Sequence, residues 1–213
     1  MFRKSVLLVT LFLFFNNTMG IAQNQLVKKF MELHAPEKWW IIMHPFSAKK
    51  AWKITAEARQ VTAEIKNNPD LDGDDNGGQV DAFRHAFWMA SLAQEIGVRK
   101  ARRLGKAHEK GNKLDYERLK TEEGMIPDLP ATQMDLKNNE VGLEIGKSYP
   151  TATRIELITL VKQAALAGKL VKIKKDKSGN YLDWQGNPIP YNEWHGKWVN
   201  AKCLVASDFK SEF

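Results

Sequence analysis

Three short stretches of the chain combine histidine with acidic or amide side chains at helical spacing. In DAFRHAFW, Asp81 and His85 are four residues apart, so one helical face can present the imidazole with a carboxylate one turn away. Arg84 lies beside them and is expected to pair with a carboxylate. Imidazole suits acid–base chemistry because its unperturbed pKa of about 6.5 allows either protonation state near neutral pH. This stretch therefore predicts one wall of a polar site.

The second stretch, AHE, places His108 on the apolar stripe that Ala101 and Leu104 begin. That spacing turns the imidazole toward the protein interior, and Glu109 follows it. We expect the histidines of two consecutive helices to meet across a helical hairpin.

The third stretch, MDLKNNEVGLEIG, carries Asp135, Asn138 or Asn139, Gly142 and Gly146 along one side of a helix. Asparagine and glycine are poor helix formers, by about 0.5 to 1 kcal/mol each relative to alanine. Glycines allow another backbone to approach closely, and the polar side chains supply fixed donors and acceptors. Three inward polar patches on three helices predict one shared site.

Helices must position these stretches. Apolar residues at helical spacing, bounded by capping residues and by glycine or proline, predict helices over residues 47–66, 81–96, 98–110, 131–147 and 152–167. Thr153 and Glu156 form a capping box at the start of the last one. After Gly168 the alternating pattern predicts two short strands joined by a turn at residues 178–180. The expected fold is mainly α, a compact multi-helix domain with a small β-hairpin near the C-terminus.

The N-terminus is typical of a secretory signal peptide. A basic start precedes an apolar run over residues 6–15, and small residues Gly20 and Ala22 follow with the spacing of a cleavage site. A membrane span needs about 20 apolar residues, so we expect no transmembrane segment. We therefore expect a signal peptide over residues 1–22, cleaved near Ala22, and a secreted or periplasmic protein.

Composition limits the domain organisation and the classes of partner. The 213 residues, 43% of them hydrophobic, suffice for one core but not for two large domains. We expect a helical domain carrying the polar site over residues 23–168, with residues 169–213 packed on it. The single cysteine, Cys203, permits no intramolecular disulfide. A formal charge of +7 suits an anionic envelope or lipid surface, and it is too small to indicate nucleic acid.

A metal-binding version of the site would use His85, His108 and Asp135 as ligands. Catalytic zinc prefers three protein ligands with an open fourth position for water. The chain has no HExxH motif or similar tight spacing, so we favour a site without metal over one with zinc or calcium.

The loop DLDGDDNGG is a second place to consider a cation. Asp72, Asp74 and Asn76 match the start of a calcium-binding EF-hand loop, but Phe83 stands where the bidentate acid belongs. We therefore favour a polar turn over a degenerate calcium site.

The order of NGGQVDAFRHAFW, AHE and MDLKNNEVG resembles an uncharacterised bacterial domain of secreted, polymorphic-toxin-associated or wall-associated proteins. The resemblance covers roughly residues 74–146 and supplies no established reaction. Leu143 stands where relatives often have a basic residue. The resemblance implies importance for Asn76, Gly77, Asp81, Arg84, His85, Trp88, His108, Glu109, Asp135, Asn138, Asn139 and Gly142.

The layout is also similar to that of secreted phospholipase A2, in which a calcium loop precedes a helix with the catalytic histidine. Ala86 stands where that family has a calcium-binding aspartate, and the flanking cysteines are absent. The likeness is therefore one of layout.

These observations lead to three functional hypotheses. The first is a hydrolase of a cell-envelope component, a lipid ester or a peptidoglycan bond. In it His85 is the general base, oriented by Asp81 or Asp135, and His108 is an acid, an oxyanion stabiliser or a metal ligand. The second is a noncatalytic envelope-binding module whose polar cluster is a buried structural network. The third is a nuclease-type toxin domain, against which the modest charge counts.

Overall fold

The computed structural model describes residues 27–67, 69–121 and 124–210. The expected signal peptide lies outside these residues. The chain divides into two compact units, residues 1–34 and residues 35–213. In the first unit, residues 27–32 are helical. The second unit contains the elements that carry the candidate site residues.

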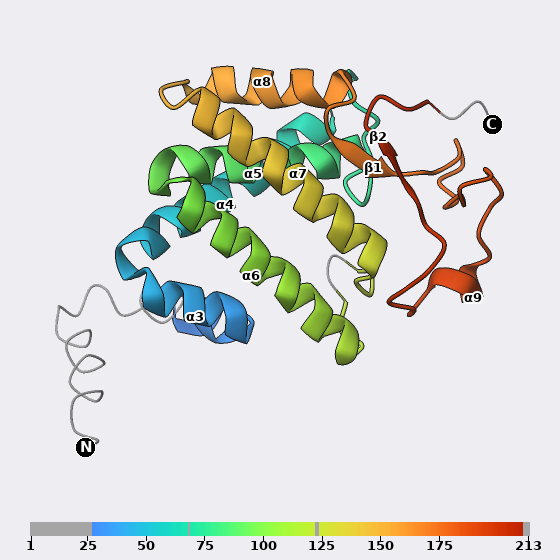
Figure 1. Ribbon diagram of the computed structural model, residues 1–213, viewed down its shortest axis with the longest axis horizontal. Coiled ribbons are helices and arrows are strands. Elements are labelled where there is room, and N and C mark those ends of the chain that lie inside the picture. The colour runs from blue at the N-terminus through green and yellow to red at the C-terminus, as the bar shows by residue number, and fades with distance from the viewer. Residues whose placement is uncertain (1–26, 68, 122–123, 211–213) are drawn as a thin grey trace. The chain divides into compact units, whose positions relative to one another are not determined.

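The second unit is mainly helical and has a two-stranded antiparallel sheet near its C-terminal end, which confirms the predicted fold class. No helix in the described ranges is long and apolar enough to cross a membrane. In chain order the elements are α3 (Ala35–Met43), α4 (Pro45–Lys66), α5 (Gln79–Ile96), α6 (Val98–Glu117), α7 (Leu129–Ser148), α8 (Arg154–Leu166), β1 (Val171–Ile173), α9 (Tyr191–Trp194) and β2 (Leu204–Ala206) (Figure 1).

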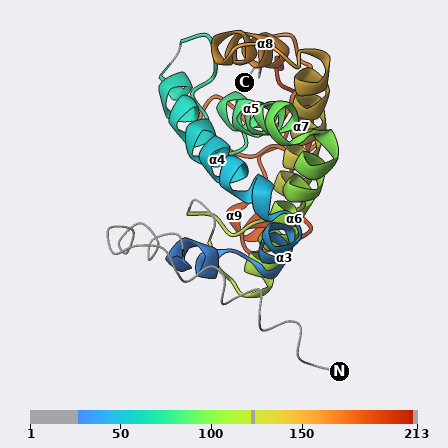
Figure 2. The same cartoon turned by 90° about the vertical axis from the view of Figure 1, so that its left-hand side faces the viewer.

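Helix α5 is the central element of this unit. It packs against α4, α6, α7, α8 and β1, and Figure 2 shows it between α4, α7 and α8. Its apolar residues are buried on every side, and Phe83, Phe87, Met89 and Leu92 are fully buried. A helix buried all round needs neighbours for its polar residues as well, because buried polar groups are expensive without partners.

The tightest helix contact is the crossing of α5 and α7. A side chain added at Gly142 would overlap the carbonyl oxygen of Ala86, and one at Gly146 would overlap that of Ala90. The two backbones can approach this closely only because both positions are glycine. This confirms the predicted reason for the glycines and brings the polar residues of α7 up to those of α5.

The small sheet is not the local hairpin that the alternating pattern suggested. Strand β1 pairs with β2, Val171 opposite Ala206, and the segment between them contains only single bridges such as Lys175 to Tyr181. Asp176 and Asp183 explain the difference. The Asp176 carboxylate accepts the backbone N–H groups of Ser178 and Asn180, and the Asp183 carboxylate accepts that of Asn187. These bonds close two successive turns, which leaves room for single bridges but not for a continuous ladder.

Helices α6 and α3 differ most from the prediction. Helix α6 continues through Gly111, which is buried within it, because tertiary packing offsets the low helix propensity of glycine. Helix α3 was not predicted, since its apolar residues 39–43 are consecutive and show no helical period. The capping box of Thr153 and Glu156 is confirmed at the start of α8.

Candidate active site

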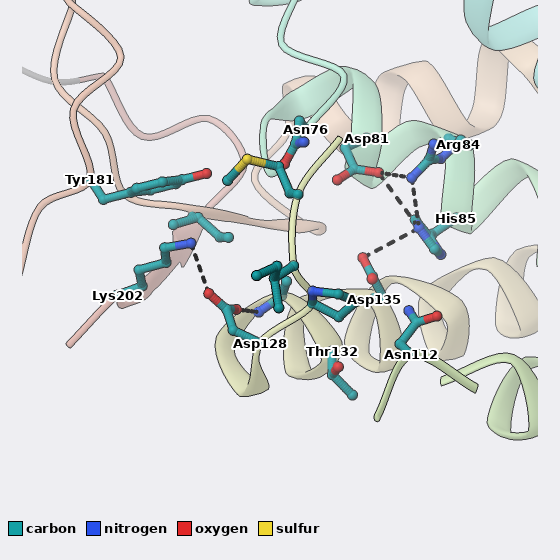
Figure 3. Close-up of a pocket in the computed structure, with 15 residues that line it drawn as sticks. Asn76, Asp81, Arg84, His85, Asn112, Asp128, Thr132, Asp135, Tyr181 and Lys202 are labelled. Atoms are coloured by element: carbon teal, nitrogen blue, oxygen red, sulfur yellow. Dashed lines mark hydrogen bonds and ion pairs between the residues drawn. The ribbon is translucent and has the colours of Figure 1, made fainter. Parts of the chain in front are cut away.

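A pocket of about 60 Å³ lies where the first half of α5, the start of α7 and the C-terminal segment meet (Figure 3). One water molecule needs roughly 10 to 15 Å³ of such space, so the pocket can hold a few waters or one small group. Its polar lining comes from Asn76, Asp81, Arg84, His85, Asn112, Asp128, Thr132, Asp135, Tyr181 and Lys202.

His85 lies among charged groups at one end of the pocket. Its Nε2 atom is 3.3 Å from an oxygen of Asp135 and 3.5 Å from Oδ1 of Asp81. Nη2 of Arg84 lies 3.3 Å from the same nitrogen and donates to Oδ1 of Asp81 at 2.7 Å. The backbone N–H of Gly77 donates to the other Asp81 oxygen at 2.7 Å, which fixes this carboxylate in place. The structure thus brings together Asp81, Arg84, His85 and Asp135, as the sequence analysis expected.

Burial lowers the pKa of His85 well below its ordinary value of 6.5. The positive charges of Arg84 and His108 lower the pKa further, while the Asn139 side chain acts in the opposite direction. Burial and the neighbouring positive charge thus favour the neutral imidazole over the protonated one. A neutral ring can accept a proton or coordinate a metal ion, whereas a protonated ring can do neither.

Several buried polar atoms on α5, α6 and α7 have no hydrogen-bond partner in the described ranges. Within the described ranges they include Nδ1 of His85 on α5, Oδ1 of Asn112 on α6, and Oγ1 of Thr132 and both carboxamide atoms of Asn139 on α7. His85, Asn112 and Thr132 line the pocket. Native proteins leave few buried polar groups unsatisfied, and those that remain usually bind ordered water or an ion or take part in chemistry. The pocket is therefore built to hold something polar.

Comparison with known proteins identifies the domain that contains this pocket. Residues 38–169 match a family described as a domain of unknown function (DUF6973), and the match covers more than half of the chain. The chain belongs to this family. No curated protein and no solved structure matches the chain. The resemblance to an uncharacterised family is thus confirmed at the level of the DUF6973 domain.

Within the DUF6973 domain, His108 lies away from the pocket lining. Its Nδ1 atom is 3.2 Å from a carboxylate oxygen of Glu37 on α3, and its ring packs edge-on against Trp88. Helix α3 was not predicted, so this partner could not be foreseen. Glu109 is buried one residue further on and accepts a hydrogen bond from Asn112 at 3.2 Å. The sequence analysis expected His108 to share the site of His85, whereas the structure places it in a contact between α3, α5 and α6.

The two asparagines of α7 have different surroundings. The carboxamide of Asn138 donates to the carbonyl oxygen of Val171 at 2.8 Å and accepts from the N–H of Val171 at 2.9 Å. Asn138 therefore fastens β1 to α7. Asn139 instead lies close enough to His85 to influence its pKa, although neither of its polar atoms has a hydrogen-bond partner in the described ranges.

The opposite wall of the pocket was not predicted from the sequence. Nζ of Lys202 donates to Oδ2 of Asp128 at 2.8 Å, and both side chains are almost fully buried. The ammonium lies 3.8 Å from the centre of the Tyr181 ring. Lys202 and Tyr181 follow the residues that match the DUF6973 family, and no local pattern marks them.

The surroundings of this wall also shift the pKa values of Lys202 and Tyr181. Burial lowers the pKa of Lys202, although the Asp128 carboxylate opposes that effect. Burial, together with the nearby carboxylates of Asp128, Asp74 and Asp81, raises the pKa of Tyr181 to about 12. Lys202 has an anionic partner in Asp128, so this side of the pocket is a paired structural element.

The calcium-like loop uses its carboxylates for structure. Asp72 accepts from the backbone N–H of Gln79 and so caps α5, and Nζ of Lys172 lies 3.2 Å from its Oδ2 atom. Nζ of Lys175 donates to Asp74 at 2.5 Å and to the carbonyl oxygen of Asn76 at 2.6 Å. Lysine ammonium groups thus supply the positive charge at these oxygens, which supports the polar-turn interpretation.

Proposed function

We propose that the pocket is the active site of a secreted hydrolase that acts on a component of the cell envelope. The observation that carries this proposal is the meeting of a neutral, buried His85 with Asp81 and Asp135 at the end of a small polar pocket. Strongly perturbed ionisable groups with specific charged neighbours in a pocket are typical of catalytic sites.

A water molecule in the pocket would be the nucleophile. As its oxygen attacks the carbonyl carbon of the substrate, the water proton passes to the His85–Asp135 pair, and the same pair returns a proton to the leaving oxygen or nitrogen. Because His85 and Asp135 are 3.3 Å apart, they act as one coupled acid–base unit. Arg84 places positive charge beside them, where it can stabilise the developing oxyanion.

The size of the pocket bears on the substrate. A volume of about 60 Å³ admits the scissile group and its water, not a whole lipid or glycan. The rest of the substrate would lie outside it. The expected signal peptide places the substrate beyond the cytoplasm, so a lipid ester and a peptidoglycan bond are the two classes to test.

One position separates this pocket from the layout of secreted phospholipase A2. Ala86 is fully buried at the crossing with Gly142, so the position has no room for a metal-binding aspartate. A lipid-ester activity would therefore use the His85 cluster without the calcium geometry of secreted phospholipase A2.

The unpartnered polar atoms count against the noncatalytic alternative. A buried network stabilises a fold when all its members are satisfied, and it destabilises the fold when some are not. Asn112, Thr132 and Asn139 each retain a buried polar atom without a partner in the described ranges. Those of Asn112 and Thr132 lie in the pocket lining, where they are available to a bound water or substrate.

The test is a hydrolysis assay on phospholipid vesicles, purified peptidoglycan and RNA, with the wild type and the variants His85→Gln and Asp135→Asn. The proposal predicts turnover of a lipid ester or peptidoglycan, reduced by about 10² to 10⁴-fold in both variants. His195→Gln is the control, because this exposed histidine lies outside the pocket lining. Full activity of His85→Gln would overturn the assignment, and cleavage of RNA alone would support a nuclease instead.

A further inference from the structure

Three metal-ligand atoms converge at the end of the pocket. Asp81, His85 and Asp135 each present an oxygen or nitrogen, and these atoms all lie within 4.8 Å of one another. All three residues are buried, and they come from two helices whose crossing is fixed by Gly142 and Gly146. The donor atoms are therefore held by the core of the domain.

Two of the three separations match those of ligands around one metal ion, and the third is no longer than 4.8 Å. Zinc binds imidazole nitrogen and carboxylate oxygen at about 2.0 to 2.2 Å, so neighbouring ligands of a tetrahedral ion lie about 3.4 Å apart. Nε2 of His85 lies 3.3 Å from Asp135 and 3.5 Å from Asp81. We propose that Asp81, His85 and Asp135 bind one divalent transition-metal ion, such as zinc, whose remaining position faces the pocket.

Pocket residues beyond the three ligands offer partners to a metal-bound water. Oδ1 of Asn112 and Oγ1 of Thr132 line the pocket, are more than nine-tenths buried, and have no hydrogen-bond partner in the described ranges. Asn139 lies close enough to the His85 ring to influence its pKa, which makes its carboxamide the candidate hydrogen-bond partner of the ring. Metal-binding histidines usually have such a partner, which fixes the orientation of the ring.

Arg84 competes with the ion for Asp81 and His85. Its Nη2 atom contacts both Asp81 and the Nε2 atom of His85, so the guanidinium occupies the side from which a cation would approach. The Arg84 side chain is 22% exposed and can therefore swing outward. Metal binding then exchanges one cationic partner for another, which predicts that removing the arginine charge strengthens binding.

This ligand set differs from the one suggested by sequence. Asp81 replaces His108, which is held against Glu37. The inference uses the same pocket as the proposed hydrolase, and with an ion bound His85 is a ligand while the ion lowers the pKa of the water. Binding can nevertheless be measured without any substrate.

The experiment is titration of untagged, chelator-treated protein with zinc by calorimetry, and with cobalt by absorption spectroscopy. We expect the protein to bind one equivalent of zinc. With cobalt we expect the absorption spectrum of a bound ion that has a low coordination number. Binding should weaken at least tenfold in His85→Gln and in Asp135→Asn and strengthen in Arg84→Gln. His195→Gln and Asp74→Asn are matched controls that should bind as the wild type does, because neither residue lines the pocket. Circular dichroism and thermal melting show whether each variant is folded.

Two results would overturn the inference. One is the absence of stoichiometric binding in both the wild type and Arg84→Gln. The other is unchanged binding in folded His85→Gln and Asp135→Asn. Absence of stoichiometric binding, together with hydrolysis of an envelope substrate, would overturn the metal and leave the hydrolase. Stoichiometric binding without hydrolysis of any substrate would uphold the metal and overturn the hydrolase.

Discussion

Two adjacent asparagines on α7 illustrate two ways of burying a polar side chain. The carboxamide of Asn138 is fully buried and exchanges two hydrogen bonds with the backbone of Val171. The carboxamide of Asn139 is 3% exposed, and neither of its polar atoms has a hydrogen-bond partner in the described ranges. The first arrangement stabilises the fold. The second leaves a hydrogen-bond donor and acceptor available to a ligand.

The same contrast separates the two walls of the pocket. Where the C-terminal segment meets the start of α7, Lys202 and Asp128 form a buried ion pair, and Asn200 donates a further hydrogen bond to Asp128. On the wall formed by the three helices, Asn112 and Thr132 each keep an atom without a hydrogen-bond partner among the described residues. Functional sites commonly retain such locally unfavourable features, because evolution selects activity there over stability. Substitutions on the two walls should therefore have opposite effects.

The largest expected effect on stability is that of Lys202→Met. Removal of the ammonium leaves the Asp128 carboxylate buried without its cation, which should lower the free energy of unfolding by about 3 to 5 kcal/mol. Chemical denaturation measures this change. The double variant with Asp128→Asn should recover part of the loss, since no unpaired charge remains. A change in Lys202→Met below about 1 kcal/mol would contradict the distinction between the walls.

The next effect tests the asparagine pair directly. Asn138→Ala leaves the N–H and carbonyl of Val171 without their partner, so we expect a loss of about 2 to 4 kcal/mol in unfolding free energy. Asn139→Ala removes a side chain whose polar atoms are unsatisfied and should change stability by less than about 1 kcal/mol. Urea denaturation of both variants gives the comparison. Equal losses would show that Asn139 is structural as well.

A pair of threonines gives a smaller, matched test. The hydroxyl of buried Thr62 donates to the carbonyl oxygen of Ala58 at 2.7 Å, so Thr62→Val should destabilise the protein by about 1 kcal/mol. Thr132→Val replaces an unpartnered hydroxyl by a methyl group of similar size and should leave stability unchanged or raise it. Thermal melting at neutral pH distinguishes the two. Destabilisation by Thr132→Val would mean that this hydroxyl has a structural partner.

The last effect appears only at alkaline pH. Tyr181 has a pKa of about 12 in the folded protein, above the unfolded value of about 10, so the folded state binds the phenolic proton more tightly. Its contribution to stability is therefore complete below pH 10 and is lost as the pH rises from 10 to 12. Tyr181→Phe should show a shallower decline over that range, measured by denaturation at each pH. An identical decline would mean that Tyr181 ionises normally.

The sequence was sufficient to predict the parts of the site that lie within single helices. The four-residue spacing of Asp81 and His85 makes them neighbours in any helix, and the glycines of α7 indicate a close backbone approach. The meeting of His85 with Asp135 could be expected from these two facts together. Local periodicity likewise predicted α4, α5, α7 and α8, because each presents a helical pattern in its own sequence.

Only the tertiary structure decided which long-range partners complete the pocket. His108 pairs with Glu37 and does not line the pocket, because α3 packs on α6 and supplies a carboxylate there. Lys202 pairs with Asp128, which lies 74 positions away in the sequence. Strand β1 pairs with β2 and not with the segment that directly follows β1. Helix spacing is fixed by backbone geometry and can be read from sequence. The partner of a buried charge depends on which distant segment covers it, and packing of the whole domain determines that segment.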